Sequence, residues 1–250
     1  MPHFSYQGKR VYYREKGSGE VLIILPGNTA SSAVHDGEIE YFCKNYRVIC
    51  PDYPGYGKSE RIDSFPTDFW WSNAHVALEL IRSLQTDSII AVGTSGGAMI
   101  ALNMAIIAPN FIKAVIADGF IGEFWSLEWA KTIVKDRDAK TRFQRSFWQA
   151  AHGEDWEKVV QKDSLMLLEA ARKGESAFKG RLKEIFCPVL FTGSLSDDLI
   201  PDIERGMCRV ARQISSSKVV FYPNGTHPLM WSRAVEFRKE VSSFLANLGI

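Results

Sequence analysis

A glycine-rich turn between two apolar segments constrains the possible fold more than any other feature of this sequence. Gly93-Thr94-Ser95-Gly96-Gly97 follows the apolar run at residues 88–92 and leads into the apolar segment 97–108. A sharp turn from a buried strand into a buried helix requires a strained backbone at Ser95 and small neighbouring residues. The Ser95 hydroxyl is then expected to stand exposed at a helix N-terminus, where backbone N–H groups favour a developing negative charge. We predict a nucleophile at Ser95; the alternative is an ordinary turn with a helix-capping serine.

The rest of the chain alternates short apolar runs with longer segments of helical periodicity. The run at 21–25 stops at Pro26-Gly27, which is typical of a strand buried on both faces. Further strands are expected at residues 47–50, 88–92, 114–117, 188–191 and 218–222. Helices are expected at 67–84, 97–108 and 230–248, the last with an apolar stripe of Trp231, Val235, Val241, Phe244, Leu245 and Leu248. This alternation predicts an α/β fold with a mostly parallel central sheet and helices on both faces.

The N-terminal residues follow a different pattern. Residues 4–6 and 10–15 alternate in polarity on either side of Gln7-Gly8-Lys9. Such a pair of runs around a glycine turn indicates a hairpin, which we place at an antiparallel edge of the sheet.

The segment 120–186 also interrupts the alternation. It is rich in aromatic side chains and has no strand-like run, so we predict a helical insertion over the carboxyl ends of the strands, where open α/β sheets bind ligands. The expected domains are a core of residues 1–119 and 187–250 and a cap of residues 120–186. At least half of these aromatic side chains must serve the packing between cap and core and not a substrate pocket. The candidate substrate-pocket residues are Trp125, Trp129 and Trp148.

Size and charge exclude several classes of function. The chain has 250 residues, of which 46% are hydrophobic, enough for one sizeable core. Thirty basic and 29 acidic side chains give a net charge of +1, so no strong field attracts nucleic acid or anionic lipid. We expect a small-molecule substrate and a monomer or homodimer, with neither a nucleic-acid nor a membrane partner.

Three further patterns point to a cytoplasmic protein. The sequence shows no secretory signal, and no apolar run approaches the roughly 18 residues of a membrane helix. The four cysteines form no C-x-x-C pair and have no histidine at zinc spacing, which favours buried thiols in a reducing compartment and no metal site.

A serine nucleophile needs a base that a third group orients. Of the five histidines, only His227 follows a late strand in a loop with turn residues around it, although a lone loop histidine is more often a surface residue. Asp197 and Asp198 follow the strand at 188–191 and are the acid candidates; the alternative for both is a carboxylate at a helix start. The resulting chain order of nucleophile, acid and base is the one expected for this sheet topology.

The loop after the first central strand should complete an oxyanion hole. Gly27 in Pro26-Gly27-Asn28-Thr29 permits a close backbone approach. The backbone N–H groups of Asn28 and Gly96 are then expected to face the pocket together. The alternative is an ordinary turn.

At these residues the chain resembles the α/β-hydrolase superfamily over nearly its whole length, from residue 11 to 248. The resemblance rests on the segments 25–28, 52–59 (D-x-P-G-x-G-x-S), 93–97, 197–201 and 225–227. It implies the α/β-hydrolase fold, a helical cap like that of small esterases and C–C hydrolases, and a structural role for the turn at 52–59. Relatives commonly carry a histidine, usually structural, where this chain has Pro26.

The resemblance also favours one of the candidate acids over the others. Asp197 keeps the family's spacing of four residues to Pro201, whereas Asp198 lies nearer the expected helix start and could cap it. Some relatives place the acid at the end of the preceding strand, which makes Asp118 a third candidate.

Serine at position 95 further limits the classes of reaction that we expect. Haloalkane dehalogenases and epoxide hydrolases of this fold carry aspartate at the equivalent position, whereas serine favours an acyl-enzyme. We expect a cofactor-free serine hydrolase, most simply a carboxylesterase for small apolar esters. An acyltransferase or a C–C bond hydrolase could use the same residues, and a slow-turnover ligand receptor on this fold is a third possibility.

Overall fold

A central eight-stranded sheet organises the computed structural model, which describes residues 2–250. Met1, the first residue of the predicted core, lies outside the described residues. The strands are β1 (His3–Tyr6), β2 (Lys9–Lys16), β3 (Val21–Leu25), β4 (Arg47–Pro51), β5 (Ile89–Thr94), β6 (Ile112–Asp118), β7 (Val189–Ser194) and β8 (Ser217–Tyr222). Their spatial order is β1-β2-β4-β3-β5-β6-β7-β8. β1 and β2 pair antiparallel at one edge, β2 also pairs antiparallel with β4, and the remaining neighbours are parallel, which confirms the predicted sheet.

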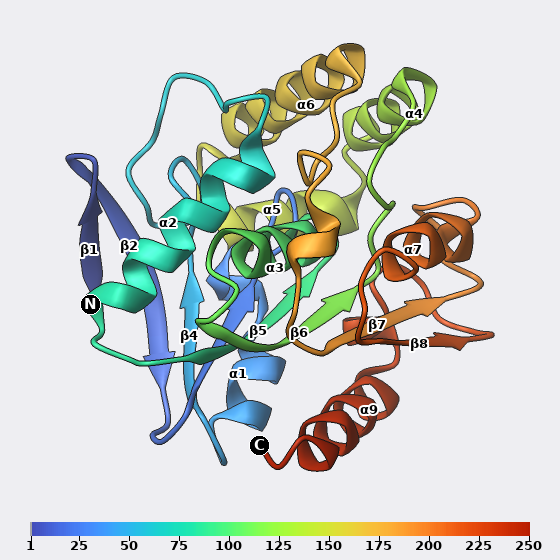
Figure 1. Ribbon diagram of the computed structural model, residues 1–250. Coiled ribbons are helices and arrows are strands. Elements are labelled where there is room, and N and C mark those ends of the chain that lie inside the picture. The colour runs from blue at the N-terminus through green and yellow to red at the C-terminus, as the bar shows by residue number, and fades with distance from the viewer. Residues whose placement is uncertain (1) are drawn as a thin grey trace.

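Helices cover both faces of this sheet (Figure 1). They are α1 (Asp36–Phe42), α2 (Phe69–Ser83), α3 (Gly96–Ile107), α4 (Leu127–Asp138), α5 (Arg142–His152), α6 (Trp156–Lys173), α7 (Ile203–Ala211), α8 (Leu229–Ser232) and α9 (Ala234–Asn247), with 3-10 turns η1 (Ser32–Val34) and η2 (Leu182–Glu184). Successive side chains of a strand point to opposite faces. Ile23 therefore packs in the same apolar cluster as α2 and α3, and Ile24 in the cluster of α1 and α9. Within residues 2–250, no helix is both long and apolar enough to cross a bilayer.

The C-terminal helix differs from the expected single helix at 230–248. The structure contains two helices, α8 and α9, separated at Arg233, whose φ of −130° and ψ of 49° are not helical. The break changes the phase of the side chains. Val235 is 76% exposed and Leu248 38% exposed, while Phe237 is buried in the core. The single stripe through all six predicted positions was therefore wrong.

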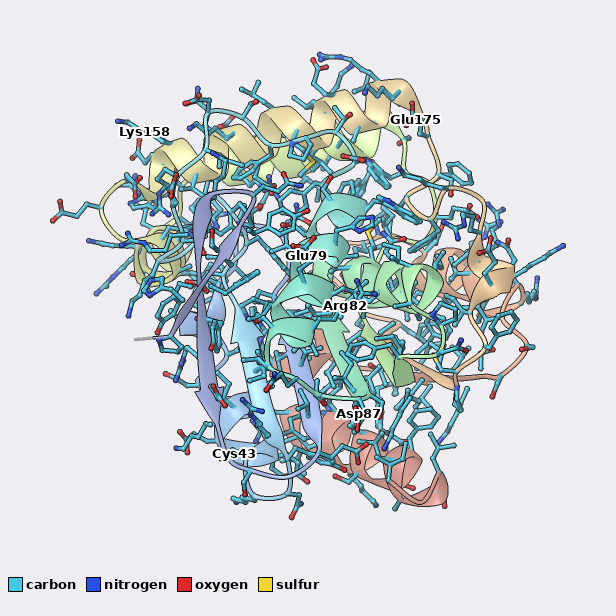
Figure 2. All side chains as sticks on the ribbon, turned by 60° about the vertical axis from the view of Figure 1, so that its left-hand side comes forward. Cys43, Glu79, Arg82, Asp87, Lys158 and Glu175 are labelled. Carbon is cyan, nitrogen blue, oxygen red and sulfur yellow. The ribbon has the colours of Figure 1, made fainter. Side chains whose placement is uncertain are left out.

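Residues 120–186 contain α4, α5, α6 and η2. In Figure 2, Lys158 and Glu175, near the two ends of α6, lie at the opposite end of the molecule from Cys43, which precedes the amino end of β4. The loop that follows the carboxyl end of β3 also contacts α6, through a hydrogen bond from Asn28 to Asp163. We therefore propose that residues 120–186, called the cap below, cover the carboxyl ends of the strands as a domain on the core.

Candidate active site

Ser95 lies in the turn between β5 and α3. Its φ of 54° and ψ of −125° fall in a region that non-glycine residues rarely adopt. The Ser95 N–H donates to the carbonyl of Asp118, 2.7 Å away, and ties the turn to the neighbouring strand β6. The sheet on both sides of β5 thus holds the strained residue in place.

The turn also requires a very close approach of backbone to backbone. A Cβ atom at Gly97 would lie 2.0 Å from the carbonyl oxygen of Leu25, well inside any real contact distance. Residue 97 must therefore be glycine if α3 is to start directly beside the end of β3. This contact explains the second glycine of the pattern, as the sequence predicted.

His227 and Asp197 form a hydrogen-bonded pair. Nδ1 of His227 lies 2.8 Å from Oδ2 of Asp197. The other oxygen of Asp197 accepts the backbone N–H groups of Leu199 (3.0 Å) and Ile200 (2.8 Å). The Asp197 side chain is 1% exposed, so these bonds fix its carboxylate in one orientation toward the imidazole. Such a partner holds the imidazole in one tautomer and one orientation.

Asp198, the second acid candidate, contacts His227 in a different way. Its exposed carboxylate accepts the backbone N–H of His227, 2.8 Å away. The expectation that it caps a helix starting at Pro201 was wrong, because α7 begins only at Ile203. Asp198 holds the main chain of the histidine loop and not its ring.

Asp118, the third candidate, is a buried carboxylate beneath the same loop. It accepts the hydroxyl groups of Thr94 (3.1 Å) and Thr192 (2.7 Å) and the backbone N–H of Met230 (3.0 Å). Burial raises the pKa of Asp118 to about 6, against the opposing effect of these hydrogen bonds and of His227. Asp118 therefore stabilises the segment that follows the histidine loop, whereas Asp197 binds the imidazole of His227.

Gly96 and Asn28 border Ser95 from two different segments. Gly96 is the first residue of α3, where backbone N–H groups have no acceptor within the helix, and Asn28 follows β3. A Cβ atom on Gly96 would lie 2.0 Å from Oδ1 of Asn28, so the two residues are in close contact. The same Oδ1 accepts Nε1 of Trp70 (3.0 Å), and Nδ2 of Asn28 donates to Asp163 (2.7 Å). Both ends of the Asn28 amide are thus engaged.

A cavity of about 430 Å³ connects these residues. It is lined by Ser95 and His227 together with Asn28 and Gly96, and its volume is in the range of small-molecule sites. Within residues 2–250, no group of three or more His, Cys, Asp or Glu side chains is placed to hold a metal ion. The cavity brings together the hydroxyl of Ser95 and the imidazole of His227, and charged side chains, among them Arg137, also line it.

The three tryptophans singled out in the sequence all line this cavity. Trp129 donates from Nε1 to the carbonyl of Leu199 (3.2 Å), and Trp148 donates to Oγ1 of Thr29 (3.2 Å). Trp125 packs edge-on against Trp70, with 4.8 Å between ring centroids. Each tryptophan therefore contacts the core as well as the cavity.

Other cavity residues were not identified from the sequence. Trp70 fitted the apolar stripe of its helix, and Trp231 fitted the expected stripe of the C-terminal helix, so neither was distinguished from a core residue. Arg137 belongs to a charged stretch at the end of α4, yet its side chain is only 10% exposed and it lines the cavity. A residue whose charge is buried by a distant segment leaves no local pattern.

Comparisons with known proteins agree with this architecture. A family model described as the alpha/beta hydrolase fold matches residues 20–150. The human serine hydrolase BPHL is 25% identical over 250 residues, covering 95% of this chain and 84% of that protein. An Acinetobacter baylyi protein, (E)-2-((N-methylformamido)methylene)succinate hydrolase, is 26% identical over 76% of this chain and 77% of its own length. The crystal structure of an enol-lactonase from Burkholderia xenovorans superposes with a TM-score of 0.77 at 16% identity, covering 98% of this chain and all of that one.

Proposed function

The chain belongs to the α/β-hydrolase fold family, and from this premise we propose that it is a serine hydrolase that cleaves small carboxylic esters through an acyl-enzyme. One observation carries the proposal. His227, which is hydrogen-bonded to Asp197, lines the same cavity as Ser95, and Ser95 lies in a strained turn at a helix start. A hydroxyl, a base and an orienting acid are the groups that acyl transfer requires.

In the acylation step, Oγ of Ser95 attacks the ester carbonyl while Nε2 of His227 takes its proton. Asp197 stabilises the imidazolium through Nδ1. The N–H groups of Asn28 and Gly96 donate to the oxyanion that forms on the carbonyl oxygen. The imidazolium then gives its proton to the leaving alcohol, and the acyl group remains on Ser95.

In the deacylation step, water takes the place of the alcohol. His227 removes a proton from the water as it attacks the acyl-enzyme, and the same two N–H groups hold the second oxyanion. Collapse of this intermediate returns the proton to Ser95 and releases the carboxylic acid. No step needs a cofactor.

The lining of the cavity favours apolar substrates of small or medium size. Met99, Phe120 and the tryptophans line it, and several of the lining residues belong to the cap. A volume of about 430 Å³ accommodates short acyl and alcohol groups but not a long lipid chain.

A second candidate is an ester or amide that carries a carboxylate, and Arg137 favours it. Nη1 of Arg137 donates to Asp163 (2.7 Å) and Ser164 (3.1 Å). A guanidinium has five N–H donors, so further donors remain for a ligand in the cavity that Arg137 lines. The Acinetobacter relative is named as a hydrolase of a substituted succinate, which is a substrate of this kind.

A panel of 4-nitrophenyl esters tests the proposal. Acyl chains from C2 to C16 measure size, and the valerate and hemiglutarate esters form a matched pair that differs in one terminal carboxylate. We expect multiple turnover with a preference for short neutral chains; a preference for the hemiglutarate would select the second candidate. A single slow acylation, accompanied by ligand-dependent melting shifts, would instead identify a receptor. Added alcohol acceptors distinguish an acyltransferase.

A further inference from the structure

Asp163 of α6 is a fully buried carboxylate that binds three separate segments of the chain. Oδ1 accepts Nη1 of Arg137 in α4 at 2.7 Å. Oδ2 accepts Nδ2 of Asn28 at 2.7 Å and the hydroxyl of Tyr56. The side chain of Asp163 is 0% exposed. Because a buried charge is costly unless it is paired and hydrogen-bonded, this set of donors is strongly constrained in position.

Asp163 reaches the loop after β3 at two points. The first is its direct bond to the side chain of Asn28. The second passes through Tyr56, whose hydroxyl accepts the backbone N–H of Thr29 at 3.4 Å. Burial and the neighbouring Asp163 raise the pKa of Tyr56 well above its usual value, so the phenol stays protonated as the donor to the carboxylate.

The side chain of Asn28 is held from both sides. Trp70 of the core donates to its Oδ1, and Asp163 of the cap accepts from its Nδ2. This clamp leaves the amide one orientation, directly over Gly96, where only a glycine fits. The backbone N–H of Asn28 is attached to the same Cα as the clamped side chain, so the clamp also sets its direction.

We propose that Asp163 is a positioning residue: it holds Asn28 so that the backbone N–H of Asn28 is aimed at the oxyanion beside Ser95. This inference rests on the proposed function and deepens it. Since Asp163 belongs to the cap and Ser95 to the core, the oxyanion hole is complete only while α6 is docked on the loop after β3.

Another polar contact docks the cap without touching Asn28. Arg61 of the core pairs with Asp155 through two bonds of 2.8 Å and also donates to the carbonyl of His152 at 2.8 Å. Loss of the Arg61–Asp155 pair weakens docking and leaves the clamp on Asn28 in place. Asp155→Asn is therefore a matched control for Asp163→Asn, with the same chemical change on the same side of the interface.

The experiment compares these two variants on a short 4-nitrophenyl ester. Asp163→Asn keeps the volume but cannot satisfy three donors, so the loop shifts. We expect kcat to fall by about 10- to 100-fold with KM nearly unchanged, because a misplaced oxyanion donor affects the transition state and not ground-state binding. A trifluoromethyl ketone, which adds to Ser95 and forms an oxyanion, should lose affinity by the same factor as kcat, whereas the corresponding alcohol should bind as before. Asp155→Asn should keep the parent kcat.

A double-mutant cycle with Asn28→Ala assigns the effect to the clamp. If Asp163 acts through Asn28, adding Asp163→Asn to Asn28→Ala should lower kcat no further. A parental kcat in Asp163→Asn overturns the inference, as does a loss fully additive to that of Asn28→Ala. Should Asp163→Asn fail to fold, Asn28→Ala cuts the same bond from the core side, and a parental kcat there is equally decisive. Activity in Ser95→Ala would instead contradict the proposed function itself.

Discussion

The carboxylate of Asp197 lies 2.8 Å from the imidazole of His227, although 30 residues separate them in the chain. The neighbouring Asp198 binds the backbone of the same histidine, so two adjacent aspartates hold one residue by different atoms. Because the two aspartates bind different atoms of His227, the two acid candidates can be tested separately.

Replacement of Asp197 by Asn should lower kcat by roughly 10⁴-fold and leave the fold intact, because the imidazole is then held in the wrong tautomer. Asp198→Asn removes the negative charge from the acceptor of a main-chain N–H and should cost about 1 kcal/mol of stability, with a much smaller effect on kcat. Turnover and melting temperature of both variants, measured side by side, decide the assignment. An inactive Asp198→Asn next to a normal Asp197→Asn would reverse it.

Ser95→Ala should abolish multiple turnover, with a loss of several orders of magnitude, and leave the melting temperature equal to or above that of the parent protein. A fluorophosphonate should label the parent protein at Ser95, and the variant should remain unlabelled in intact-mass spectra. Near-parental esterase activity in Ser95→Ala would eliminate the acyl-enzyme mechanism.

His152 should make the protein sensitive to acid. Its Nδ1 accepts the N–H of Gly57 (3.0 Å) and its Nε2 lies 3.0 Å from the carbonyl of Thr29, so the folded state requires a neutral ring. Burial lowers the pKa of His152 from 6.5 to about 4. The unfolded chain therefore binds a proton first as pH falls, and about 3 kcal/mol of unfolding free energy is lost between pH 6.5 and 4. Urea denaturation across this range should show that the His152 contribution is absent from His152→Gln, whose amide can keep one acceptor and one donor.

Asp118 should change the free energy of unfolding in the opposite direction over nearly the same pH range. Its pKa is raised from 3.8 to about 6, so the folded state holds a proton that the unfolded chain has already released. Its contribution is fully present below pH 3.8 and is lost as pH rises through 6, again by about 3 kcal/mol. In the parent protein, the pH-dependent contributions of His152 and Asp118 to the free energy of unfolding nearly cancel. His152→Gln should consequently lose stability as pH rises from 4 to 6, and Asp118→Asn should gain it; parallel curves for the two variants would contradict both assignments.

The sequence predicted those parts of the site that follow from short-range patterns. The turn at Ser95 lies between a buried strand and a buried helix that are both almost entirely apolar, and both can be identified from adjacent residues. The chain order of Ser95, Asp197 and His227 follows from the positions of strand ends along the chain. The sheet and its antiparallel edge were predictable for the same reason, because each strand is a continuous or alternating run.

The clamp on Asn28 could not be predicted in this way. Asp163 is 135 residues from Asn28 and 107 from Tyr56, and each of the three looks like an ordinary polar residue of its own segment. Their partnership exists only after the cap folds onto the core. The helix break at Arg233 was missed for a different reason: the apolar residues on both sides of it still fit one helical period by chance.

The order of the segments along the chain has a consequence for synthesis. Ser95 and the whole cap precede Asp197 and His227 in the chain. The last two strands, β7 and β8, follow the cap and add in turn to the edge of the sheet beside β6. A nascent chain that has emerged only as far as the cap carries the serine and most of the cavity wall but neither the acid nor the base. We expect prematurely terminated products to be inert toward esters, so that hydrolysis begins only when the last strand and its loop leave the ribosome.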